Sequence, residues 1–143
     1  MDMTLNQNAA AEMWRPVILT FESACSFDNP FLDVEIWAEF TGPSGRVIRR
    51  EAYWDGERIY RVSFAPTELG AWSYVIEAPE QTGLNGRTGN VEAVPYTGDL
   101  DLYRHGFIRV ADDSRMFAYS DGTPFFWLGD THWEFAYRES WDP

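Results

Sequence analysis

The densest group of side chains able to take part in chemistry lies near the C-terminus of the sequence. A carboxylate, an imidazole and an indole occur within four residues, at Asp130, His132 and Trp133. A carboxylate and an imidazole form hydrogen bonds with polar ligands, and an indole can stack on a ligand with a flat face. Two simpler roles compete with ligand binding: Asp130 could cap the following turn or helix, and His132 could be structural or merely exposed.

Aromatic side chains on the expected strands form a second candidate group, at Trp54, Tyr60, Trp72 and Tyr74. Aromatic faces bind pyranose rings, so these four could form a sugar-stacking platform. Packing in the core or between domains is the favoured alternative, because all four fall at strand positions. Trp37 differs from them, because it lies on the polar face of its strand. We therefore expect Trp37 to be the exposed aromatic residue and a candidate for substrate binding.

The sequence has few residues suited to disulfide, metal or covalent chemistry. Cys25 is the single cysteine, which excludes an internal disulfide and a cysteine-rich metal site, and we interpret it as a packed thiol. The absence of lysine excludes a P-loop and a lysine Schiff base. Asp99 and Asp101, like Asp112 and Asp113, lack the spacing of a calcium loop and suit turns instead. We expect no metal and no cofactor.

Charge narrows the range of partners. The 143 residues include 23 acidic residues and 11 basic ones, all of them arginine, for a formal net charge of -12. No basic face is visible, so we expect neither nucleic acid nor an anionic membrane as a partner. No apolar run approaches the roughly 18 residues of a membrane span, and residues 1–13 do not resemble a signal peptide. The chain as written is predicted to be cytoplasmic, and secretion remains open if a leader was removed.

Short strands are the elements that would position these residues. Residues 31–41 alternate apolar and polar side chains, which predicts a half-buried strand. Glycine and proline turns, such as the tight-hairpin signal Asp55-Gly56, separate this segment from similar ones. Residues 1–12 are polar and expected to be frayed. The expected strands are residues 14–21, 31–41, 46–54, 58–65, 71–78 and 90–94. This spacing is typical of a β-sandwich or a barrel.

The C-terminal part has a different pattern. Residues 95–103 read as a linker, and residues 106–110 and 116–119 predict a small hairpin. Residues 125–129 then form a continuous apolar run without alternation, which is typical of a strand buried on both faces in a parallel sheet. This run therefore indicates the beginning of a second domain.

Two segments resemble known families. The first is a pattern of aromatic residues and turns: EAYWDG at 51–56, YRVSFAP at 60–66, GAWSY at 70–74 and LNG at 84–86. It resembles the domain of unknown function 5060, an immunoglobulin-like β-sandwich that precedes glycoside hydrolase barrels. The second is the run YSDGTPFFWLGDTHW at 119–133. It looks like the opening of the apiosidase-like barrel family (domain of unknown function 4038, related to glycoside hydrolase family 140). Together the two resemblances cover most of residues 14–141.

The resemblance implies a fold and an organisation. We expect an all-β chain: an immunoglobulin-like antiparallel β-sandwich with a C-terminal extension that holds a β-hairpin and the first strand of a truncated TIM barrel. The sandwich module would span residues 14–95, and the linker, hairpin and barrel strand residues 96–143. The implied function is that of an accessory module of a glycoside hydrolase that acts on polysaccharide side chains.

The resemblance also implies roles for the C-terminal residues. Asp130 would stand at the end of the first barrel strand, where TIM-barrel active sites lie, and would hydrogen-bond sugar hydroxyls. Trp133 would stack on a sugar face, and His132 would contact the substrate. A glycosidase needs two carboxyl groups across the scissile bond, which in this family come from later strands. We therefore expect no catalytic residue in this chain, and a glycoside hydrolase only in the full-length protein.

Two further interpretations stay open. The chain could be a non-catalytic carbohydrate-binding module that uses exposed aromatic residues, with Trp37 as the first to mutate. It could instead be a structural interaction domain that associates with itself or a partner through the aromatic run Phe125–Leu128, because an exposed strand favours association.

Overall fold

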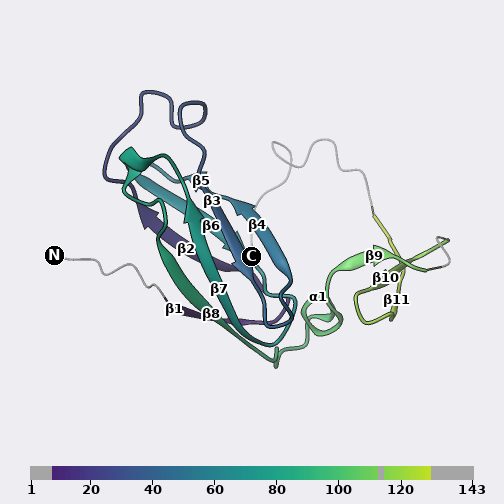
Figure 1. Ribbon diagram of the computed structural model, residues 1–143. Helices are drawn as coiled ribbons and strands as arrows, with labels where there is room; N and C mark the ends of the chain where they lie inside the picture. Colours follow the sequence, from purple (N-terminus) through teal and green to yellow (C-terminus); the bar gives the residue numbers. More distant parts are fainter. Residues whose placement is uncertain (1–7, 113–114, 130–143) are drawn as a thin grey trace.

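The computed structural model describes residues 8–112 and 115–129, which form a two-layer β-sandwich followed by a small C-terminal sheet (Figure 1). One layer has five strands in the order β1-β8-β7-β3-β4, and the other has three in the order β2-β6-β5. In the described part of the chain, helix is limited to the short η1 (Glu80–Thr82) and α1 (Asp101–His105). The prediction of an all-β sandwich is confirmed.

The larger sheet includes a strand that the sequence did not predict. Its members are β1 (Asn8–Glu12), β3 (Trp37–Thr41), β4 (Val47–Glu51), β7 (Gly70–Glu77) and β8 (Thr88–Val94). Its pairs are antiparallel except that β1 runs parallel to β8, with Asn8 opposite Asn90. The expectation of a frayed N-terminus is therefore wrong for residues 8–12. The segment has no β-branched residue, so its strand depends on pairing with the edge of β8, which no local pattern reveals.

One of the strands expected from the sequence is divided into two strands, of which the second belongs to the smaller sheet. Its members are β2 (Val17–Glu22), β5 (Tyr53–Trp54) and β6 (Ile59–Phe64). The expected strand 46–54 divides into β4 of the larger sheet and β5 of the smaller one. The chain crosses between the sheets at Ala52, whose N–H donates to the carbonyl of Ile36 at 2.8 Å. A change of sheet keeps the extended backbone, so the pattern of residues does not reveal it.

The turn between β5 and β6 agrees with its sequence signal. The Asp55 N–H donates to the Ile59 carbonyl at 2.9 Å, and the Ile59 N–H donates to the Gly56 carbonyl at 2.9 Å. Gly56 has a φ of 97°, a conformation that glycine adopts at no steric cost. The predicted hairpin is confirmed.

Residues 31–36 are not part of a strand, contrary to the alternating pattern. The Asn29 side chain accepts a hydrogen bond from the Phe31 N–H at 3.2 Å, and the Asp33 carboxylate accepts one from the Asn29 N–H at 2.8 Å. These Asx-type bonds offer the backbone an alternative to a ladder. Leu32 is 81% exposed as a result, and β3 begins only at Trp37.

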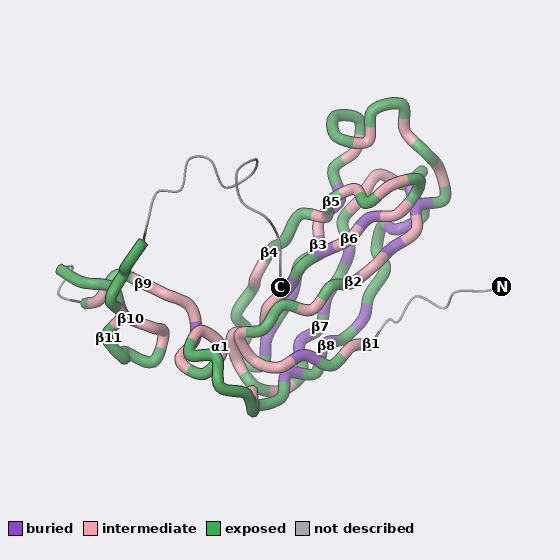
Figure 2. Tube along the Cα trace, turned by 180° about the vertical axis from the view of Figure 1, so that it is seen from behind, coloured by how far each residue is buried: buried purple, intermediate pink, exposed green. Residues whose placement is uncertain are grey.

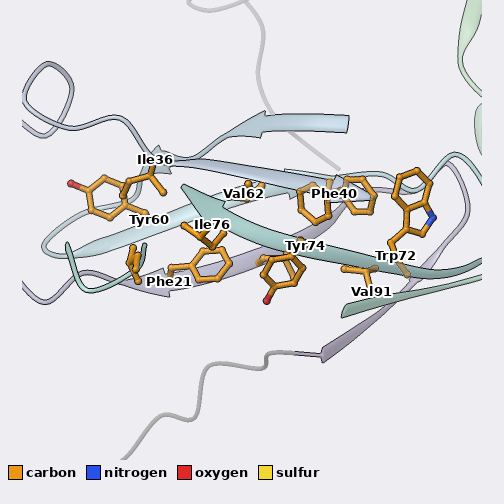
Figure 3. Packing of buried hydrophobic residues seen from close by; sticks show 14 of the residues in the cluster. Phe21, Ile36, Phe40, Tyr60, Val62, Trp72, Tyr74, Ile76 and Val91 are labelled. Carbon is orange, nitrogen blue, oxygen red and sulfur yellow. The ribbon is translucent and has the colours of Figure 1, made fainter. Parts of the chain in front are cut away.

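Aromatic rings dominate the core between the two sheets (Figure 3). Phe40 of β3 and Phe64 of β6 stack with their ring centroids 3.8 Å apart and their planes 1° from parallel. Trp72 packs edge-on against Phe64 at 5.2 Å, and its indole N–H donates to the Glu68 carbonyl at 3.0 Å. Full burial of side chains of this size stabilises a fold by about 1.5–3 kcal/mol each. The alternating burial of β3, β6, β7 and β8 therefore fixes their register.

The C-terminal part forms a three-stranded sheet in the order β11-β10-β9. Its strands are β9 (Ile108–Val110), β10 (Phe117–Tyr119) and β11 (Pro124–Phe125). The predicted hairpin is observed as the antiparallel pair of β9 and β10. The expected linker 95–103 is wrong at its end, where α1 begins at Asp101. A helix of five residues is too short to show a helical period.

The apolar run after Thr123 is not buried in the described part of the chain. β11 pairs antiparallel with β10, with Phe125 opposite Phe117. Phe126, Trp127 and Leu128 are exposed to 84%, 62% and 84%, and this end of the chain is drawn as exposed in Figure 2. Burial on both faces needs neighbouring strands and a covering layer. Among the described residues β10 is the only strand that pairs with this segment.

Candidate functional site

Trp14, in the turn between β1 and β2, joins the sandwich to the C-terminal part of the chain. Its φ is 69°, a left-handed conformation that costs roughly 1–2 kcal/mol for a residue with a β-carbon. The backbone is held there because the Trp14 N–H donates to the carbonyl of the buried Pro66 at 2.8 Å. The indole lies edge-to-face against Phe107, with ring centroids 5.2 Å apart. This pair ties the sandwich to the segment between α1 and β9.

Gly106 makes this close approach possible. Its φ is 85°, and a β-carbon there would lie 2.7 Å from Cε2 of Trp14 and 2.9 Å from Cβ of Ser120. Contacts under 3.0 Å are not tolerated by rigid neighbours, and an indole ring held by its backbone is rigid. Residue 106 is buried and ends α1. Glycine is therefore required here for both its conformation and its lack of a side chain.

Beside this contact, α1 is fastened to the turn before β11 by a side-chain hydrogen bond. Nδ1 of His105 lies 2.7 Å from Oδ2 of Asp121. Oδ1 of Asp121 accepts a hydrogen bond from the Thr123 N–H at 2.9 Å. These two contacts, that of Thr123 first and that of His105 second, lower the pKa of Asp121 to about 2. Asp121 is consequently ionised at neutral pH and holds both α1 and the turn.

A cleft of about 610 Å³ opens between the sandwich and the C-terminal part, and we call it the junction cleft. It is lined by Met13, Trp14, Arg46, Thr67, Arg104, His105, Phe107, Ile108, Arg109, Ser120 and Asp121. Its lining combines aromatic rings with three guanidinium groups, so it can bind polar ligands. Among the described residues that line it, Asp121 is the one carboxylate, whereas a glycosidase uses two across the scissile bond.

Trp37 lies at the edge of the outer face of the larger sheet. The Arg49 guanidinium lies over its ring, 4.4 Å from the centroid, and also pairs with the Glu77 carboxylate at 2.7 Å. The indole is therefore half-buried, with one face covered by a cation. Its place on the outer face is as predicted, but the expectation that it is exposed is wrong, because Arg49 covers its ring. Its role in binding stays a prediction.

The other aromatic residues in the proposed stacking platform belong to the core. Tyr60, Trp72 and Tyr74 are buried at 3%, 0% and 4% exposure. Trp54 is half-buried, donates its indole N–H to the Glu57 carbonyl at 3.0 Å and packs against that core. The favoured interpretation, core packing, is confirmed, and a sugar-stacking platform of these four is excluded.

Within residues 8–112 and 115–129, no three or more His, Cys, Asp or Glu side chains are placed to hold a metal ion. No helix in the same residues has the length and apolar character needed to cross a membrane.

Comparison with known proteins bears on both parts of the chain. Residues 10–79 match the family model of the domain of unknown function 5060, and residues 111–143 match that of the apiosidase-like catalytic domain. The predicted resemblance is confirmed. We call residues 111–143 the apiosidase-like segment from here on. No curated protein matches the chain.

A solved structure supports the same relationship. The chain is similar to a protein from Bacteroides vulgatus ATCC 8482 whose crystal structure is described as that of a "putative glycoside hydrolase". The TM-score is 0.68, the sequence identity is 28%, and the alignment covers 82% of this chain and 21% of that one. The chain thus spans about a fifth of the length of this relative. It is a module related to glycoside hydrolases.

The predicted substrate-binding residues divide between the two parts. Asp130, His132 and Trp133 belong to the apiosidase-like segment and lie outside the described residues, so their roles stay predictions. Trp37 belongs to the sandwich and to the segment that matches the domain of unknown function 5060.

Sequence reasoning missed the residues that join the sandwich to the apiosidase-like segment. In the sequence, Trp14 was interpreted as one more apolar position of the expected strand 14–21. His105 was not identified as a candidate residue. Asp121 read only as a turn residue, because Asp-Gly-Thr-Pro is a turn signal. The isolated Gly106 just before a strand was the one available signal, since such a glycine often marks a close approach.

Proposed function

We propose that this chain is the N-terminal accessory part of a glycoside hydrolase that acts on polysaccharide side chains. In this proposal the sandwich module of residues 14–95, extended by β1, braces the catalytic domain that begins in residues 96–143. The single observation that carries the proposal is the packing of Trp14 against Gly106 and Phe107. It places a rigid contact of the sandwich directly before the apiosidase-like segment.

Three contacts make this a fixed joint rather than a flexible link. The Trp14 backbone is held by Pro66, its ring is held by Phe107, and the His105–Asp121 pair fastens α1 to the apiosidase-like segment. A rigid joint transmits the orientation of one domain to the other, whereas domains joined by few contacts move independently. The sandwich would thus set the position of the first barrel strand.

The exposed apolar run supports the same proposal. Phe126, Trp127 and Leu128 lie inside the apiosidase-like segment and are largely exposed. Such a contiguous apolar surface is typical of a site that another protein surface covers. In the proposal the remaining strands and helices of the catalytic domain cover it, and carbohydrate is the partner of the whole protein.

The test is an activity assay on the complete product of the gene with polysaccharides that carry side chains. We expect the release of side-chain sugars. In the Trp14→Ala variant we expect release to fall and the catalytic domain to unfold at a lower temperature. The control is Trp54→Ala, which removes another half-buried tryptophan of the same sandwich, on β5.

Each part of the proposal can fail separately. If no polysaccharide of the panel releases sugar, the hydrolase function is wrong. If Trp14→Ala and Trp54→Ala behave alike in activity and in unfolding of the catalytic domain, the bracing role is wrong although the hydrolase function stands.

A further inference from the structure

The outer face of the larger sheet contains a groove that the joint does not use. A cavity of about 490 Å³ lies over the beginnings of β1 and β8, the middle of β7 and the second half of β3. We call it the outer-face groove and define it by the polar residues Asn8, Glu39, Thr41, Ser73, Thr88 and Asn90. Its volume is within the roughly 300–1,000 Å³ of small-molecule sites.

The strand register arranges these polar side chains in rows. Asn8, Asn90, Ser73 and Thr41 are successive partners across four neighbouring strands. Side chains at paired positions share a face of the sheet, and neighbouring strands are about 4.8 Å apart. One row therefore presents four hydrogen-bonding side chains over roughly 14 Å, the length of a few sugar rings.

A second row lies two residues along each strand. It consists of Thr88, Val75 and Glu39, which are again successive partners. Two further residues along β3 comes Trp37. The groove thus has a row of amides and hydroxyls and then a second row with a hydroxyl, an apolar side chain and a carboxylate. The indole of Trp37 lies beyond this second row and does not line the groove.

The polar groups of the groove are available to a ligand. Within residues 8–112 and 115–129, the only hydrogen bond made by the side chains of the outer-face groove is that from Nδ2 of Asn90 to Oδ1 of Asn8, at 3.3 Å. Their other donors and acceptors face solvent. The nearby Arg49, in contrast, is already engaged by Glu77 and by the ring of Trp37.

The composition of the groove favours one class of ligand. Hydroxyl, amide and carboxylate groups together offer donors and acceptors to a ligand rich in hydroxyls. A carboxylate accepts from neutral hydroxyl donors but repels another carboxylate, and the chain carries a net charge of -12. Arg49 is the cross-strand partner of Glu39, but its guanidinium pairs with Glu77 and is not among the described groups that line the groove. The ligand would therefore be uncharged.

We propose that the outer-face groove binds a neutral oligosaccharide, with Glu39, Ser73 and Asn90 as its hydrogen-bonding centre. This function is independent of the proposed catalytic activity and would hold for the 143-residue chain alone. It would keep a polysaccharide close to the enzyme to which the sandwich belongs.

The test is titration calorimetry of the 143-residue chain with hexaoses of glucose, xylose, mannose and arabinose, and with a galacturonic acid hexaose as the charged comparison. Ser73→Arg places a long cation in the middle of the groove. The matched control is Ser63→Arg, an exposed serine of β6 on the smaller sheet. Thermal unfolding of both variants checks that they are folded.

We expect at least one neutral hexaose to bind to the wild-type chain. Ser73→Arg should weaken this binding by about tenfold or more, which is equivalent to about 1.4 kcal/mol. Ser63→Arg should leave the affinity unchanged. We expect no binding of the charged hexaose. The proposal is wrong if no neutral hexaose binds, if both variants bind like the wild type, or if the charged hexaose binds as well as the neutral ones. If Ser73→Arg does not fold, Glu39→Gln takes its place, and unchanged binding there equally overturns the proposal.

Discussion

The ring of Trp14 packs against Gly106 so closely that a β-carbon on residue 106 would lie 2.7 Å from Cε2 of the indole. The two residues are far apart in the sequence, one in the turn after β1 and the other directly after α1. Their contact is reinforced by Phe107, whose ring meets the indole edge-on. Trp14 and Gly106 therefore form the joint between the sandwich and the C-terminal sheet.

Gly106→Ala should loosen this joint. Alanine at a φ of 85° is strained, and its methyl group would overlap Trp14 and Ser120, so we expect a loss of stability of about 2–4 kcal/mol. Chemical denaturation followed by tryptophan fluorescence measures it. Gly45→Ala is the control, because Gly45 has a φ of 84° and open space around its β-carbon position. An equal loss in both variants would show that backbone strain alone, and not the contact with Trp14, decides the effect.

The hydrogen bonds that Asp121 accepts from Thr123 and shares with His105 should make stability depend on acid. The folded pKa of Asp121, about 2, is below the ordinary aspartate value of 3.8. The stabilisation is therefore fully present above about pH 4 and is lost as the pH falls toward 2. We expect Asp121→Asn to be less stable than the wild type at pH 6 and the difference to shrink between pH 4 and pH 2. Thermal unfolding across this range measures it, and a difference independent of pH would exclude ionisation of Asp121 as the cause.

Four strands of the sandwich, β3, β6, β7 and β8, were predictable because each carries its own period. Apolar residues alternate along β3, β6, β7 and β8, and a buried sheet face requires this pattern. The same logic placed Trp72 and Tyr74 in the core. Glycine turns such as that at Gly56 then separated the strands.

The features that the sequence did not predict depend on partners far away in the sequence. β1 exists because β8 offers an edge, and the division between β4 and β5 exists because Ala52 crosses between sheets. The requirement for glycine at residue 106 comes from Trp14, which no local pattern links to it. The joint, and with it the site, could therefore not be predicted from periodicity.

Trp72 should be the most sensitive tryptophan of the core. It is fully buried, packs edge-on against Phe64 and donates its indole N–H to the Glu68 carbonyl. We expect Trp72→Ala to cost about 3–5 kcal/mol, the range for large cavities in a core. Trp127→Ala, at a residue 62% exposed, should change stability by less than about 0.5 kcal/mol. Urea unfolding of the two variants tests this, and similar losses would contradict the described burial.

Removal of residues 1–13 should destabilise the sandwich more than removal of residues 1–7. β1 covers the edge of β8 through five parallel pairs, and Ala11 is buried against the core. A chain that starts at residue 14 loses this strand and leaves the backbone groups of β8 unpaired at an open edge, which favours association. We expect the chain that starts at residue 8 to unfold at the same temperature as the whole chain. The chain that starts at residue 14 should unfold several degrees lower, since about 1 kcal/mol shifts the midpoint by roughly 2–8 °C in domains of about 60–250 residues. Sedimentation measures the association. Equal unfolding temperatures for all three chains would show that β1 adds no stability and that the sandwich begins at β2.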